Sequence, residues 1–231
     1  MRQLVNSMTP EEIKKLVFYL DGLRYSLQMA SLASRRLRET LDEIARNHPD
    51  KYTEEQVTSR LLDAWTLVDI CHRVRGLVQG MPGLPRKLSG FQIFLRATEQ
   101  VESLRDYVQH FRNEIPNIPF TSNPLWGVLS WTPSENHTVS FTIFSGNMVS
   151  GVYGHSLVFD KNALKYPAEL KLVASDIEVV LNHLSEQLEK VKTCISEWLD
   201  QMQQPKIQRV KVRTMVLSFP FLEIKPPAAA V

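Results

Sequence analysis

The amino-acid sequence predicts a mainly α-helical protein, an up-and-down four-helix bundle with a small antiparallel β-sheet. Three observations support this fold class. Long segments repeat apolar residues at every third or fourth position, which is the spacing of one helix face. A segment in the second half is rich in Trp, Val, Ser, Thr, Phe and Gly, and part of it alternates in polarity as a strand does. The breaks between the helical segments are short, and short connections favour antiparallel helices.

The first predicted helix covers about residues 10–46. Thr9 supplies an N-cap hydroxyl, a proline suits the first turn, and two glutamates complement the helix dipole. The segment Asn47-His48-Pro49 ends the helix. Apolar residues recur along one face at Ile13, Leu16, Leu20, Leu23, Leu27, Ala30, Leu37, Leu41 and Ile44.

Two further helices are predicted at about residues 54–80 and 90–115. Thr53 and Gln56 have the spacing of a capping box at the start of the second helix, which stops at a Gly-Met-Pro-Gly segment. The third helix ends at Pro116, because proline cannot continue a helix. The apolar stripe of the third helix consists of Phe91, Phe94, Leu95, Val101, Leu104, Val108, Phe111 and Ile115.

The β-sheet is predicted from two separate segments. Residues 125–159 contain an alternating stretch, 138–144, and two turn signals, which indicate two or three antiparallel strands. A fourth helix at about 167–202 follows, with apolar residues at helical spacing. Residues 206–219 alternate again and fit a returning strand that pairs with the insertion. We expect one composite domain over residues 1–231.

The composition is that of an ordinary globular protein. Apolar residues make up 43% and charged residues 23% of the chain, and the net charge is only +2, so no overall field indicates nucleic-acid binding. Cys71 and Cys194 give neither a disulfide framework nor a metal-ligand cluster. The first residues lack the apolar core of a signal peptide, and no apolar run reaches the ~18 residues that a membrane span needs. We therefore expect a cytoplasmic protein with no membrane association.

The common catalytic and cofactor motifs are missing from the sequence. It contains no glycine-rich nucleotide loop, no H-E-x-x-H or C-x-x-C pair, and no G-x-S-x-G elbow. We therefore expect no cofactor and no metal.

The candidate site lies in the third predicted helix, where residues 104–114 have the sequence LRDYVQHFRNE. Asp106 and His110 point away from the apolar stripe and are i,i+4 neighbours, so the carboxylate would orient the imidazole. Arg105, at the edge of the stripe, is separated from His110 by roughly 140° around the helix and about 7.5 Å along it. One helix therefore does not place both side chains on one small ligand. Two copies of the helix, crossing face to face, would form a shared cleft.

The segment Arg105-Asp106-Tyr107-Val108-Gln109-His110 resembles the R-polar-x-x-x-H motif of the HEPN superfamily of helical-bundle domains. The chain is especially similar to bacterial HEPN-like proteins, and the second-helix segment 63–73 and the break at 81–84 support this resemblance. The resemblance covers about residues 10–115 and 167–202 and leaves out the predicted strands.

The resemblance implies metal-independent RNA cleavage at a dimer cleft. His110 would act as general acid or base because an imidazole titrates near neutral pH. Arg105 would clamp the phosphate, and Asp106 would hold the imidazole. The resemblance also implies a homodimer, an RNA or nucleotide ligand, and a place in a toxin or defence system. Other members of the superfamily are catalytically silent nucleotide- or protein-binding modules, and this alternative stays open.

A simpler interpretation of the same polar residues stays open as well. Arg105, Asp106 and His110 would then form a solvated helix face, and the protein would be a structural oligomer that makes protein contacts. On the second helix, Asp69 and Arg73 favour an intrahelical salt bridge, with a supporting role beside Arg105 as the alternative.

Two tryptophans and a basic segment give weaker indications of a ligand. Trp126 and Trp131 lie five residues apart and therefore on opposite faces of a regular strand. One of them is expected in the core, and the other would stack a base if it is exposed. Arg209, Lys211 and Arg213 fit protection of a sheet edge better than phosphate binding.

Overall fold

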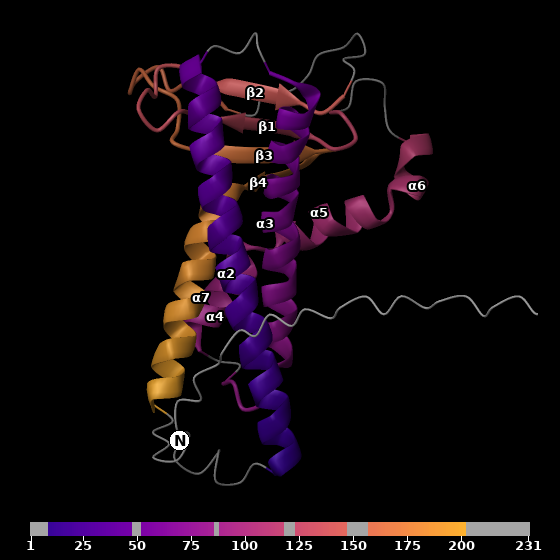
Figure 1. Ribbon diagram of the computed structural model, residues 1–231, viewed down its shortest axis with the longest axis vertical. Coiled ribbons are helices and arrows are strands. Elements are labelled where there is room, and N and C mark those ends of the chain that lie inside the picture. Colours follow the sequence, from indigo (N-terminus) through magenta and orange to yellow (C-terminus); the bar gives the residue numbers. More distant parts are fainter. Residues whose placement is uncertain (1–8, 48–51, 86–87, 118–122, 147–156, 202–231) are drawn as a thin grey trace, which may run out of the picture.

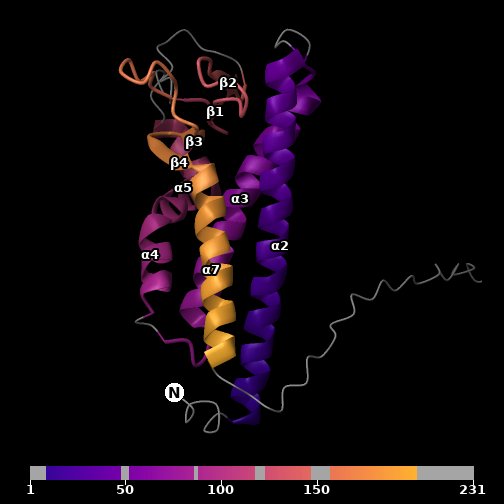
Figure 2. The same cartoon turned by 90° about the vertical axis from the view of Figure 1, so that its left-hand side faces the viewer.

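The computed structural model describes residues 9–47, 52–85, 88–117, 123–146 and 157–201. It confirms the predicted fold class, because the described chain is mainly helical and carries one small antiparallel sheet. Three long helices, α2 (Pro10–Asn47), α3 (Glu54–Gly80) and α7 (Leu181–Gln201), pack against one another, and the sheet lies towards one end of them (Figure 1, Figure 2). None of the described helices combines the length and the apolar character that crossing a lipid bilayer requires.

Hydrogen bonds confirm the two predicted helix starts. The hydroxyl of Thr53 accepts from the amide of Gln56 at 3.3 Å, and the side-chain oxygen of Gln56 accepts from the amide of Thr53 at 2.9 Å. This reciprocal pair is the expected capping box. Thr9 and Glu12 form the same kind of pair at the start of α2. At the start of each helix, two amide groups three residues apart are therefore bonded by side chains.

The prediction of a single third helix at about 90–115 is wrong. The chain instead forms α4 (Ser89–Ala97), α5 (Gln100–Gln109) and α6 (Phe111–Glu114), followed by a short 3-10 turn, η2 (Ile115–Asn117). At the first break, the hydroxyl of Thr98 donates to the carbonyl of Phe94 and accepts from Nη1 of Arg75, both at 2.7 Å. Arg75 also donates to the carbonyl of Leu95. These side chains satisfy carbonyl groups at the end of α4, so α5 leaves in a new direction (Figure 1).

The sheet has four antiparallel strands in the order β2-β1-β3-β4. β1 (Val128–Trp131) and β2 (Phe141–Phe144) come from the predicted insertion, with Leu129 opposite Ile143. β3 (Leu170–Ala174) pairs with the other side of β1, and β4 (Ile177–Val180) pairs with β3. The strand predicted at about 206–219 lies outside the described residues.

The predicted start of the fourth helix, near residue 167, is also wrong. Residues 170–180 form the β3–β4 hairpin, which turns at Ser175 with a φ of 55°, and α7 begins only at Leu181. The apolar residues of this hairpin fit a helical or a strand spacing. The open edge of buried β1 decides between them, because its backbone groups need hydrogen-bond partners, and β3 supplies them.

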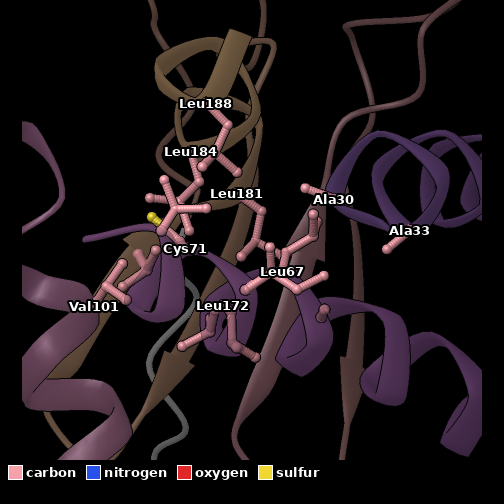
Figure 3. Packing of buried hydrophobic residues seen from close by; sticks show 14 of the residues in the cluster. Ala30, Ala33, Leu67, Cys71, Val101, Leu172, Leu181, Leu184 and Leu188 are labelled. Carbon is pink, nitrogen blue, oxygen red and sulfur yellow. The ribbon is translucent and has the colours of Figure 1, made fainter. Parts of the chain in front are cut away.

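One hydrophobic cluster connects the helices with the sheet. Figure 3 shows Leu67 and Cys71 of α3 in the same packed group as Leu172 of β3 and Leu181 and Leu184 of α7. β1 and β3 are buried along their whole length. The sheet is therefore part of the helical core and holds the chain around β1 in a fixed place.

Gly127, directly before β1, provides a test of this packing. Its φ of 86° is a conformation that L residues rarely adopt, and a Cβ there would collide with the carbonyl oxygen of Val173. We expect Gly127→Ala to lower the free energy of unfolding by about 1–3 kcal/mol. In the matched control Gly76→Ala, on the exposed side of α3, the new Cβ meets open space, and the free energy should rise by about 0.5–1 kcal/mol. Urea unfolding followed by circular dichroism measures both, and two changes of the same sign would contradict this account.

Candidate functional site

Arg105 of α5 faces α3 and makes an ion pair there. Its Nε donates to Oδ1 of Asp69 at 3.0 Å, and Nε of Arg73 donates to Oδ2 of the same carboxylate at 2.7 Å. The predicted intrahelical pair of Asp69 and Arg73 is therefore confirmed, and Asp69 contacts Arg105 as well. One carboxylate thus holds two guanidinium groups, so this cluster keeps a positive charge in excess.

The ionisation of Asp69 follows from these contacts. Burial raises the pKa of the carboxyl group, but the hydrogen bonds from Arg105 and Arg73 outweigh burial and hold the pKa below its ordinary value. The carboxylate is therefore charged at neutral pH. Because the side chain of Arg105 is only 24% exposed and donates to this charged acceptor, its guanidinium has a defined position.

Arg105 and Asp69 line one side of a pocket of about 230 Å³. The pocket is built from three separate parts of the chain, which are α3, α5 and the segment before β1. Its remaining walls consist of Trp65, Val68, Val108, Gln109 and Trp126. The arrangement is a mainly apolar, partly aromatic hollow with one arginine–carboxylate pair at its side.

Trp126 provides the most exposed aromatic surface of this pocket, with 48% of the residue accessible. Its ring packs edge-on against Trp65 and Phe111, with centroid distances of 6.1 and 4.9 Å. Nε1 of Trp65 donates to the carbonyl of Trp126 at 3.1 Å and fixes that segment on α3. Trp131, in contrast, is 1% exposed. The prediction that one of the two tryptophans is buried is confirmed, and Trp126 is the one left accessible.

His110 and Asp106 are both exposed. His110 separates α5 from α6, and its amide donates to the carbonyl of Asp106 at 3.1 Å. Within the described parts of the chain, no hydrogen bond or ion pair joins the side chains of Asp106 and His110, and none joins His110 with Arg105. The imidazole is instead accessible next to Gln109, which lines the pocket. A single chain therefore brings Arg105 to the pocket but does not join Arg105 and His110.

A second ionic cluster, which was not predicted from the sequence, positions α5. Arg75 is 7% exposed, and its Nε donates to Oε1 of Glu102 at 2.5 Å. Nδ1 of His72 lies 2.9 Å from Oε2 of the same carboxylate. Burial raises the pKa of Glu102, but Arg75 and His72 outweigh burial and hold this pKa below its ordinary value. One feature of the sequence could have indicated a buried arginine: Arg75 follows Cys71 by four residues, on the apolar side of its helix.

The known proteins add no assignment for this pocket. Among the described residues, no group of three or more His, Cys, Asp and Glu side chains is placed to hold a metal ion. No protein-family model matches the chain, and neither a curated protein nor a solved structure matches it. The HEPN resemblance therefore depends on the sequence alone, and the roles of Arg105, Asp106 and His110 stay proposals.

The charge of Asp69 can be tested through the pH dependence of stability. The folded-state pKa of Asp69 lies below its unfolded value, so its stabilisation is present above about pH 4 and is lost as the pH falls through the folded pKa. We expect the wild type to be more stable than Asp69→Asn at pH 7. The difference should shrink as the pH falls through the folded pKa, because protonation removes the charge that Asn lacks. Urea unfolding at pH 7 and at a series of lower pH values measures it, and a difference that does not shrink with falling pH would rule out the charge as its cause.

Proposed function

We propose that the protein binds single-stranded RNA, or a nucleotide, at the pocket beside Arg105. A base would pack against Trp126, and a phosphate would contact the guanidinium. The observation that carries the proposal is the position of a half-exposed tryptophan and a fixed arginine on one pocket. This proposal corresponds to one of the alternatives that the HEPN resemblance implies, a catalytically silent module that binds nucleotides.

The charge of the Arg105 cluster supports an anionic ligand. Arg73 and Arg105 share the single carboxylate of Asp69, so one positive charge is available to phosphate oxygens. A guanidinium has five N–H donors in a rigid fork. Asp69 accepts from Nε of Arg105, and within the described chain the terminal nitrogens of Arg105 make no hydrogen bond. They remain available for a ligand at the pocket.

The aromatic wall and the size of the pocket support a base as the second part of the ligand. Every nucleobase stacks on an aromatic ring, and one stacked base contributes roughly 1–3 kcal/mol. The volume of about 230 Å³ lies below the roughly 300–1,000 Å³ of pockets that enclose a whole small ligand. The pocket therefore suits one base of a strand that continues across the surface better than it suits an enclosed cofactor.

Binding of a fluorescein-labelled hexanucleotide RNA, measured by fluorescence anisotropy, tests this proposal. We expect Trp126→Ala to weaken binding by about 5- to 150-fold, because it removes the stacking surface. Arg105→Gln should weaken binding and reduce its salt dependence, because one phosphate contact is lost. Phe18→Ala removes an aromatic ring that is 65% exposed on α2, outside the pocket, and should bind RNA like the wild type. The proposal fails if the folded wild type does not bind RNA, or if Phe18→Ala weakens binding as much as Trp126→Ala.

A second candidate function is RNA cleavage, favoured by the exposed imidazole of His110 next to the pocket residue Gln109. In a homodimer, His110 of one chain and Arg105 of the other would meet at one phosphate. The 2′-hydroxyl of the RNA would attack that phosphorus, so that the O2′–P bond forms and the P–O5′ bond breaks. His110 would accept the hydroxyl proton or protonate the leaving oxygen, Arg105 would stabilise the phosphoryl oxygens, and Asp106 would hold the imidazole. A cytoplasmic location and a toxin or defence role belong to this proposal.

Cleavage is tested with a mixed RNA pool and the variants His110→Ala and Arg105→Ala. His110→Ala should lower the rate by about 10²–10⁴-fold because it removes the general acid–base. The melting temperature should barely change, because an exposed side chain contributes under ~0.5 kcal/mol. Activity should survive EDTA and leave 2′,3′-cyclic phosphate ends. A wild type that is monomeric by light scattering at micromolar concentration, or that cuts no RNA in the pool, would eliminate cleavage and leave the binding proposal in place.

A further inference from the structure

A long groove runs between α2 and α7, away from the Arg105 pocket. Two adjoining hollows form it, with volumes of about 530 and 380 Å³. They share Leu27, Ser31 and Arg35, so they make one continuous surface. Along α2 the groove extends from Leu20 to Arg38, which is about 27 Å of helix.

Small residues explain why the two helices leave this groove open. The part of the groove near the sheet is lined by small residues, which are Ala30, Ser31 and Ser34 on α2 and Ser185 on α7. The hydroxyl of Ser185 donates to that of Ser34 at 2.8 Å, so α2 and α7 are in contact through these two short side chains, while the space around this contact stays open. Larger side chains at these positions would fill the space between the helices.

The floor and one rim of the groove are apolar. The part of the groove farther from the sheet is lined by the apolar residues Leu20, Leu23, Leu27 and Ile195. Leu32, on the rim, is 51% exposed. Exposed apolar surface of this kind, bordered by polar residues, is typical of a protein-interaction site.

The charges on the groove are mainly positive. Four cations line it, which are Arg24, Arg35, Arg38 and Lys192, against one carboxylate, Glu189. Lys192 is paired with Glu189 at 2.9 Å, and Arg24 is paired with Asp21 at 2.9 Å. Arg35 is exposed, and it forms no ion pair within the described residues. An occupant of the groove would therefore need carboxylates beside its apolar face.

We propose that the groove between α2 and α7 binds an acidic amphipathic helix of a partner protein. Two packed helices present a channel into which the side chains of a third helix fit, and this mode of recognition uses an apolar stripe that repeats every three to four residues. The length of the groove matches about 18 residues of such a helix. This interaction is separate from the Arg105 pocket, and the proposal does not depend on RNA binding there.

The charges also disfavour two other occupants. A second copy of the chain, related by a two-fold axis through the groove, would bring the same arginines face to face, and like charges at an interface oppose association. Residues 202–231 of the chain itself contain five Lys and Arg residues and one Glu. The same repulsion applies to them.

Two synthetic helical peptides of about 18 residues test the proposal by fluorescence anisotropy with the full-length protein. Both carry the same leucine stripe, and glutamates flank it in one peptide and lysines in the other. We expect the glutamate peptide to bind at least about tenfold more tightly at low salt, with a preference that shrinks as salt is added. Arg35→Glu should weaken the glutamate peptide and strengthen the lysine peptide. Equal binding of both peptides by the wild type, or binding of neither, would overturn the proposal.

The apolar contact has its own matched pair of variants. Leu32→Asp should weaken binding of the glutamate peptide by about tenfold or more, because it replaces apolar surface that the peptide would bury with a charge. Leu62→Asp changes a leucine on α3 that is 62% exposed and does not line the groove, and it should bind like the wild type. If both variants bind like the wild type, the peptide does not occupy the groove and the proposal is wrong.

A benzophenone photocrosslinker in place of Leu32 identifies the occupant directly. In the presence of the glutamate peptide, mass spectrometry should find the crosslink on that peptide. A crosslink between two copies of the chain would assign the groove to self-association. A crosslink to residues 202–231 of the same chain would assign it to an internal contact, and either result would overturn the proposal.

Discussion

The buried guanidinium of Arg75 is the interaction on which the candidate site depends. It lies on the inner face of α3 and bonds the carboxylate of Glu102, the hydroxyl of Thr98 and the carbonyl of Leu95. A buried charge is tolerated only when it is paired and hydrogen-bonded, and these three partners come from α5, the break before it and α4. The cation therefore sets where the third helical segment bends and where α5 crosses α3. Arg105, one turn beyond Glu102 in α5, reaches Asp69 because of that crossing.

The pocket joins two stable parts of the structure at one point. The sheet is anchored in the core through β1 and β3, and the segment before β1 carries Trp126 to the side of α3. There, Nε1 of Trp65 holds the carbonyl of Trp126, and the hydroxyl of Tyr107 donates to the carbonyl of Leu125 at 3.1 Å. The exposed ring of Trp126 therefore sits on a backbone fixed from two helices. Such a surface loses little entropy when a flat ligand packs on it.

The local charge at each of the two proposed binding surfaces indicates more about its ligand than the total charge of the chain does. The chain as a whole carries only +2, yet both surfaces have a local excess of cations. At the pocket, two arginines share one carboxylate on a small aromatic hollow, which suits one phosphate and one base. At the α2–α7 groove, cations border a long apolar channel, which suits a helix with acidic flanks. The pocket is lined by α3 and α5 and the groove mainly by α2 and α7, so the two proposed ligands would not compete for the same residues.

The sequence by itself determined the features that depend on neighbouring residues. The helical spacing, the Thr53–Gln56 capping box and the strand alternation around 141–144 involve contacts within a few positions, so the fold class and two helix starts could be predicted. The spacing of Asp69 and Arg73 likewise predicted their salt bridge.

What only the tertiary structure decided depends on partners far along the chain. The 170–180 segment became a hairpin because buried β1 needed a neighbour, the third helix broke where Arg75 reaches across from α3, and Arg105 met Asp69, 36 positions away. Periodicity does not encode such pairings, because they follow from how the elements pack.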